Sequence, residues 1–232
     1  MSSSPLLMAS AIVSAILLPA TLLLWALARW PVGRRSAGAA AFVGLLAMSL
    51  LTFLSLLPLA AAGLWALARR DLRLLAALAA AALATAGALA LLSPLAGYDH
   101  WQAFRTAEAL HNPEGWWGLS RPGLYLASRA ECLLENLLFL SFPLAAAWLA
   151  ASPWRSWREP GPLAALAMLT VYALFLLSGG AHTGETARTL LFLYPWVLAG
   201  FAASVRGGPA STLLLATAIQ TAAMQFLGNY FW

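Results

Sequence analysis

The sequence contains no lysine and a single cysteine, and it is poor in charged residues of either sign. Charged residues make up 9% of the chain, against about 25% in a soluble domain, whereas hydrophobic residues make up 62%. This composition excludes an ordinary soluble fold and predicts an all-α, polytopic membrane helix bundle. The lone Cys132 excludes an internal disulfide and lacks the second cysteine that a CxxC metal site needs.

The positive charge comes entirely from 13 arginines, which give a net charge of +5. No arginine cluster alternates with stacking aromatic residues in a soluble segment, so we expect no nucleic-acid partner. The arginines separate apolar runs, each of which we compare with the roughly 20 residues of a spanning helix. The runs cover 5–27, 38–67, 74–93, 130–151, 161–178, 188–205 and 209–231. We interpret residues 1–232 as one transmembrane domain in a bacterial inner membrane, with the first run a spanning helix rather than a signal peptide.

The run at 38–67 has two interpretations. As one helix it gives seven membrane segments and places the arginines before and after it on opposite sides of the membrane. As a short hairpin of about 38–53 and 57–67, broken near Ser55 and Pro58, it gives eight segments and puts these arginines on one side. We prefer the hairpin, because inner loops tend to carry the arginines.

The hairpin interpretation distributes the polar residues unequally between the two sides. The side expected to be cytoplasmic collects Arg29, Arg34, Arg35, Arg69, Arg70, Arg73, Arg155, Arg158 and Arg206. The opposite side collects all three histidines and most acids, namely His100, His111, His182, Asp99, Glu108, Glu114, Glu131, Glu135 and Glu185. We therefore expect any chemistry to take place on the outer face.

The outer face includes the only sizeable hydrophilic loop, residues 94–129. Helical spacing at 98–111 predicts an amphipathic helix with Trp101, Phe104 and Leu110 on one flank, lying in the membrane interface. It could be a purely structural helix or a lid over a lipid site. Glu131 and Glu135 then enter the next spanning helix, where acids are costly in lipid and should face protein or a wet cavity.

A second polar stretch, Ser178–Trp196, reads SGGAHTGETARTLLFLYPW. Thr183 is a plausible N-cap, and Glu185 and Arg188 then share one face of the first turns, just after His182. A helix N-terminus with an added arginine suits a phosphate or pyrophosphate group. The alternative is a capped helix in which Glu185 and Arg188 only pair with each other.

Several of these short motifs follow one another in an order typical of a known family. A Gly-Glu-x-x-Arg opens an apolar run with a proline, an Arg-Pro follows the loop helix, and the next helix carries an asparagine and a proline. The residues concerned are Gly184, Glu185, Arg188, Pro195, Asp99, His111, Arg121, Pro122, Asn136, Pro143, Phe53, Pro58, Gln220, Gln225 and Trp232. Over roughly residues 20–232 the sequence resembles the C-terminal half of GT-C glycosyltransferases, which use polyprenyl-phosphate sugars outside the membrane.

The resemblance implies transfer of a sugar from a polyprenyl-phosphate donor. A carboxylate would deprotonate the acceptor hydroxyl, and Arg188 with its helix N-terminus would stabilise the departing phosphate. The first candidate loop, 28–37, has no acid where the family carries its base, so Asp99 is the candidate base in this chain. The candidate substrate-binding residues are Arg188, Glu185, His182, His100, His111 and Arg121.

The missing acid leaves other interpretations open. A second chain could supply an N-terminal catalytic half, or the chain could be a non-catalytic membrane subunit or scaffold that binds a lipid phosphate. A transporter ranks lower, because the spans hold few polar residues besides Ser, Thr, Gln220 and Gln225. No cofactor is required by the sequence; a divalent metal is compatible with it.

Overall fold

The computed structural model describes residues 5–111, 117–151, 156–179, 190–204 and 210–228. This part of the chain is helical and contains no strand, which confirms the all-α prediction. The helices are α1 (Pro5–Arg29), α2 (Arg34–Leu51), η1 (Phe53–Ser55), α3 (Leu56–Ala68), α4 (Leu72–Ala96), α5 (His100–His111), α6 (Trp117–Ser120), α7 (Pro122–Leu140), α8 (Phe142–Ala150), α9 (Pro160–Ser178), α11 (Leu193–Ser204) and α12 (Ala210–Gly228).

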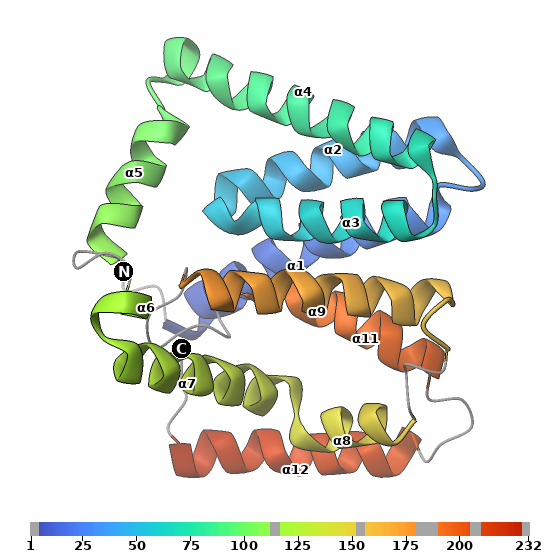
Figure 1. Ribbon diagram of the computed structural model, residues 1–232, viewed down its shortest axis with the longest axis vertical. Coiled ribbons are helices and arrows are strands. Elements are labelled where there is room, and N and C mark those ends of the chain that lie inside the picture. The colour runs from blue at the N-terminus through green and yellow to red at the C-terminus, as the bar shows by residue number, and fades with distance from the viewer. Residues whose placement is uncertain (1–4, 112–116, 152–155, 180–189, 205–209, 229–232) are drawn as a thin grey trace.

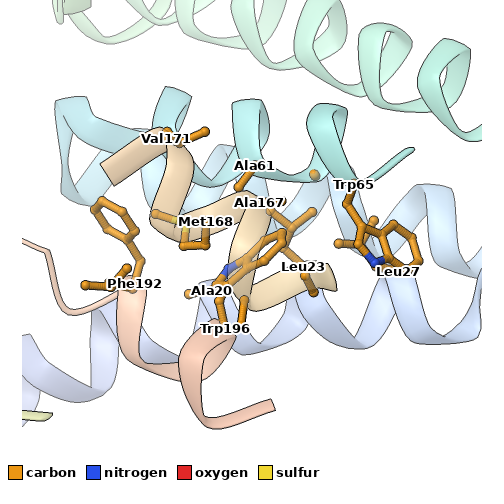
Figure 2. Close-up of a cluster of buried hydrophobic side chains, with 14 of the residues drawn as sticks. Ala20, Leu23, Leu27, Ala61, Trp65, Ala167, Met168, Val171, Phe192 and Trp196 are labelled. Carbon is orange, nitrogen blue, oxygen red and sulfur yellow. The ribbon is translucent and has the colours of Figure 1, made fainter. Parts of the chain in front are cut away.

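Most helices run back and forth along one common direction, as Figure 1 shows, whereas α5 lies across one end of the bundle. The centre is formed by α1, α3, α9 and α11, and Figure 2 shows their apolar side chains meeting there. Trp196, Phe192 and Met168 are almost completely buried in this cluster. Packing is therefore tightest in the middle of the bundle and looser toward α5 and α12.

Small residues allow α9 and α11 to approach closely. A Cβ built on Gly200 would lie 2.5 Å from the Cβ of Ala165, and one built on Gly161 would lie 2.8 Å from the Cβ of Ala203. Helix pairs in membranes gain stability from such close van der Waals contact, because lipid is as apolar as the helix surfaces. These glycines set the separation of the two central helices.

The run at 38–67 forms a hairpin, as the preferred interpretation predicted. The break lies at Thr52, in extended conformation with φ −153° and ψ 142°, and its hydroxyl accepts a hydrogen bond from the Leu54 backbone N–H at 3.2 Å. Pro58 lies within the first turn of α3 rather than at the break. Proline is tolerated there, because the first N–H groups of a helix have no intrahelical partner.

Hydrogen bonds tie three arginine-bearing loops into one end of the bundle, here called the arginine-rich end. The Trp30 indole N–H donates to the Asp71 carboxylate at 3.1 Å, joining the α1–α2 loop to the α3–α4 loop. The Trp65 indole N–H donates to the Pro160 carbonyl at 3.1 Å, joining α3 to the start of α9. The single-helix interpretation is therefore wrong, since it would place the first two loops at opposite ends.

The run at 130–151 is not one straight helix, which corrects our expectation. Its helix begins earlier, at Pro122, and the chain turns by 90° at Ser141, where φ is 82°, between α7 and α8. Gln220 of α12 bridges the break by accepting from the Phe142 N–H at 2.9 Å and donating to the Leu138 carbonyl at 2.7 Å. The side chain thus gives the Phe142 N–H a partner at the bend, and it adds a second donor to the Leu138 carbonyl, which also accepts from the Ser141 N–H at 3.2 Å.

Among the described residues, three helices are long and apolar enough to cross a membrane, and a fourth span results if the bent pair α7–α8 counts as one. The three are α2, α4 and α9. Four shorter apolar helices cover 17–29, 53–68, 193–203 and 211–224. The structure thus supports a membrane protein with several spans, whereas the predicted total of seven to eight is not confirmed.

Candidate functional site

The candidate site residues that the structure describes lie at the end of the bundle opposite the arginine-rich end, which we call the α5 end. Figure 1 shows α5, the start of α7 and the end of α9 gathered there. The Tyr125 hydroxyl donates to the Leu177 carbonyl, which fixes the first turn of α7 beside the last turn of α9. The segment 180–189 continues from this point, so His182, Glu185, Arg188 and the proposed Thr183 cap lie outside the described residues.

Asp99, the candidate base, has a structural role at the start of α5. Its carboxylate accepts a hydrogen bond from the Gln102 backbone N–H at 3.0 Å, and its carbonyl accepts from the Ala103 N–H at 3.0 Å. This is the geometry of an N-cap, which stabilises a helix by about 1 kcal/mol. The side chain is exposed, so the cap accounts for Asp99 without any catalytic role.

His100 differs from Asp99 because it is half-buried among aromatic rings. Its Nδ1 lies 3.2 Å from the Tyr98 hydroxyl, and its ring lies 5.2 Å from that of Phe53 at the hairpin tip. His111 is the last residue of the same helix. The predicted amphipathic helix therefore exists, and it docks through His100 and Phe104, whereas Trp101 and Leu110 remain exposed.

Arg121 occupies the N-cap position of α7, with an exposed side chain. The Arg121 side chain makes no capping hydrogen bond to the first turn of this helix, and Pro122 at its first position has no N–H. The N–H groups of the first turn and the positive end of the helix dipole therefore follow directly on an arginine in the chain. This combination favours an anion at the start of α7.

About two turns further along α7, Arg129 is buried against α9, with 7% of its surface exposed. Its Nη1 donates to the Leu176 carbonyl at 2.7 Å, and its Nη2 donates to the Ser128 hydroxyl at 3.2 Å. Its guanidinium also lies 5.1 Å from the centre of the Tyr125 ring. A charge buried among apolar helices is costly, so it requires partners of this kind.

Further polar side chains continue from Arg129 along the same face of α7. The Asn136 amide donates to the Cys132 carbonyl at 2.8 Å, and Tyr172 of α9 donates to that carbonyl at 3.3 Å. The Tyr194 hydroxyl of α11 lies 3.4 Å from the Asn136 side-chain oxygen. These side chains form a polar cluster in the contact of α7, α9 and α11.

Glu131 and Glu135 lie in the middle of α7, not in its first turns as expected, because the helix begins at Pro122. Glu131 is exposed, so of the two expected surroundings, protein or a wet cavity, it does not face protein. Glu135 is half-buried beside the polar cluster. Within the described part of the chain, no three His, Cys, Asp or Glu side chains come together in a way that could hold a metal ion.

Sequence reasoning missed most of this cluster. Arg129 and Asn136 could have been recognised, since a charge and an amide lie seven residues apart in an apolar helix. Tyr172 and Tyr194 could not, because a tyrosine in an apolar run resembles an interfacial anchor.

When the chain is compared with models of protein families, with curated proteins and with solved structures, no match is found.

Proposed function

We propose that the chain is a multi-pass protein of a bacterial inner membrane that binds the phosphate of a polyprenyl-phosphate lipid at the α5 end. In this proposal seven to eight membrane segments carry the arginine-rich end on the cytoplasmic side and the α5 end outside, with α5 in the interface. The observation that carries the proposal is the exposed Arg121 at the N-terminus of α7, whose first turn is held beside the end of α9 by Tyr125. The segment with Glu185 and Arg188 follows from that same end of α9.

The proposed role in chemistry is transfer of the sugar from such a lipid, as part of a GT-C-like glycosyltransferase. Positive groups placed where the leaving phosphate gains charge stabilise the transition state. Arg121 and the α7 N-terminus supply such groups here, and Arg188 adds another. His100, His111, His182 and Glu185 would contact the sugar or the phosphate, and a second chain would supply the missing acid.

A second candidate function is a non-catalytic subunit that only binds the lipid phosphate. The capping role of Asp99 favours it, because a carboxylate that accepts backbone N–H groups is held in its structural position. Both functions share the phosphate site and differ only in the transfer step. A single binding experiment therefore tests what they have in common.

The experiment measures binding of undecaprenyl phosphate to the purified chain in lipid nanodiscs by native mass spectrometry. Replacing Arg121 or Arg188 with alanine should weaken binding by roughly 10- to 100-fold, as expected for a hydrogen bond to a charged group. Arg158→Ala, at the arginine-rich end, is the matched control and should bind normally. Equal binding of undecaprenyl phosphate by all three variants would contradict the proposed phosphate site. Binding of neutral undecaprenol as tight as that of undecaprenyl phosphate would contradict it too.

A further inference from the structure

A recess lies between α2, α4 and α5, away from the α7–α9 contact. It has a volume of about 230 Å³, and its lining is mainly apolar. Phe53, Phe104 and Trp101 form its aromatic side, with Phe53 5.6 Å from Phe104 and Trp101 stacked on Phe104 at 5.4 Å. Pockets for whole drug-sized ligands measure about 300–1,000 Å³, so this one suits a single substituted ring rather than a whole lipid.

The recess exists because the α2–α3 hairpin is shorter than its neighbour. Helix α2 has 18 residues and α4 has 25. At 1.5 Å per residue, the seven-residue difference leaves the hairpin tip about 10 Å short of the end of α4. Helix α5 covers the space above the tip through the contact of His100 with Phe53. The floor of the recess therefore lies at the depth of the membrane helices.

Thr85, on the α4 wall of the recess, has 6% of its surface exposed, and its hydroxyl has no hydrogen-bond partner. Four other helix threonines, Thr21, Thr106, Thr170 and Thr221, donate to the carbonyl four residues earlier at 2.7–2.9 Å, and Thr217 bonds to the Ser141 hydroxyl at 3.2 Å. Thr85 departs from this pattern. A threonine in a helix has two favoured rotamers, so its hydroxyl can turn toward a group in the recess.

The hydroxyls of Ser49 and Ser55 also line the recess. They bond to each other at 2.8 Å, and neither bonds to Thr85. On the α5 side of the recess stands His100. When the Tyr98 hydroxyl donates to Nδ1 of His100, the imidazole carries its proton on Nε2. The recess then has one donor on its α4 wall and one at its α5 side, with aromatic rings beside them.

We propose that the recess binds a neutral, membrane-soluble ring with an acceptor oxygen at each end, which is the chemistry of an isoprenoid quinone. Neutrality follows from depth, since a charged group among the membrane helices is costly without a partner. One carbonyl oxygen accepts from Thr85 and the other from His100, while the ring lies against Phe53 and Trp101. The recess shares His100 with the proposed sugar and phosphate contacts, but it contains no residue of α7 or α9, so binding of a ring there does not require Arg121 or Arg188.

Trp101 provides the measurement, because quinones quench tryptophan fluorescence. The full chain in detergent micelles is titrated with decylubiquinone, and the signal of the Trp101→Phe variant is subtracted. We expect saturable quenching, an affinity at least about fivefold lower in Thr85→Val, and unchanged affinity in Thr170→Val, the matched control. His100→Phe should also weaken binding.

A competition experiment separates the quinone from a simple apolar chain. Decylbenzene has the chain and a ring but no oxygen, and it should fail to displace decylubiquinone. Equal displacement by decylbenzene, unchanged affinity in Thr85→Val, or quenching that rises linearly without saturation would each overturn the proposal.

Discussion

The guanidinium of Arg129 in α7 donates a 2.7 Å hydrogen bond to the carbonyl of Leu176 in α9. This contact joins two helices whose contact is otherwise limited, and it holds the start of α7 at the site where the lipid phosphate is proposed to bind. It also leads into the polar cluster of Asn136, Tyr172 and Tyr194. The buried charge of Arg129 therefore acts together with the Tyr125–Leu177 and Tyr172–Cys132 hydrogen bonds in holding α7 against α9.

Replacing Arg129 with alanine should lower the stability of the chain by about 1.5–3 kcal/mol, because its charged hydrogen bonds are lost. Thermal unfolding in detergent measures the change. Arg105→Ala is the control, since Arg105 is exposed and stacks on Trp101 at the α5 end. If Arg129→Ala were as stable as Arg105→Ala, the buried contact would contribute nothing to the stability of the chain.

Replacing Gly200 with alanine should destabilise the packing of α9 on α11. The added Cβ would stand 2.5 Å from that of Ala165, and such overpacking costs about 1–3 kcal/mol. Gly87→Ala is the matched control, because nothing lies within 4 Å of its Cβ position. Comparing the unfolding temperatures of the two variants tests the prediction, and equal temperatures would refute it.

Replacing Gln220 with leucine should destabilise the bend between α7 and α8. The Phe142 N–H would lose its partner and the Leu138 carbonyl would keep only the Ser141 N–H, and hydrogen bonds between membrane helices contribute about 0.6–1.7 kcal/mol each. Thr221→Val on the same helix should change little, because Thr221 bonds within its own helix. Unfolding of both variants in mixed micelles measures the difference; an undisturbed Gln220 variant would mean that the bend is stabilised by other contacts.

Cysteine labelling tests the proposed topology. Single cysteines at Val32 and Arg70 should react with a membrane-impermeant maleimide from one side, and a cysteine at Glu108 from the other. The native Cys132 is buried and should add little background. Labelling of positions 32 and 70 from opposite sides would contradict the hairpin. In the hairpin both loops lie at one end, where Trp30 is hydrogen-bonded to Asp71.

The sequence was informative where arginines and prolines mark loops. The positions of the arginines on either side of residues 38–67 favoured the hairpin, and Trp30 and Asp71 confirm it. At residues 130–151 the expectation of one helix was wrong, because the apolar run gives no sign of a 90° bend apart from Pro143. The bend depends on Gln220, some 80 residues later, and such a long-range partner is not visible in local periodicity.

The candidate site was only partly predictable for the same reason. Helical spacing located α5, and the capping role of Asp99 could have been read from its place at the helix start. The cluster of Arg129 with Tyr172 and Tyr194 depends on how α7 rotates against α9 and α11. Residue types alone do not fix that rotation.

The most direct test of the proposed phosphate site is photo-crosslinking in membranes with a polyprenyl phosphate that carries a diazirine near its phosphate. We expect crosslinks in residues 121–129 at the start of α7 and in residues 182–190. Crosslinks concentrated in residues 29–35 and 69–73, at the arginine-rich end, would contradict the proposed site.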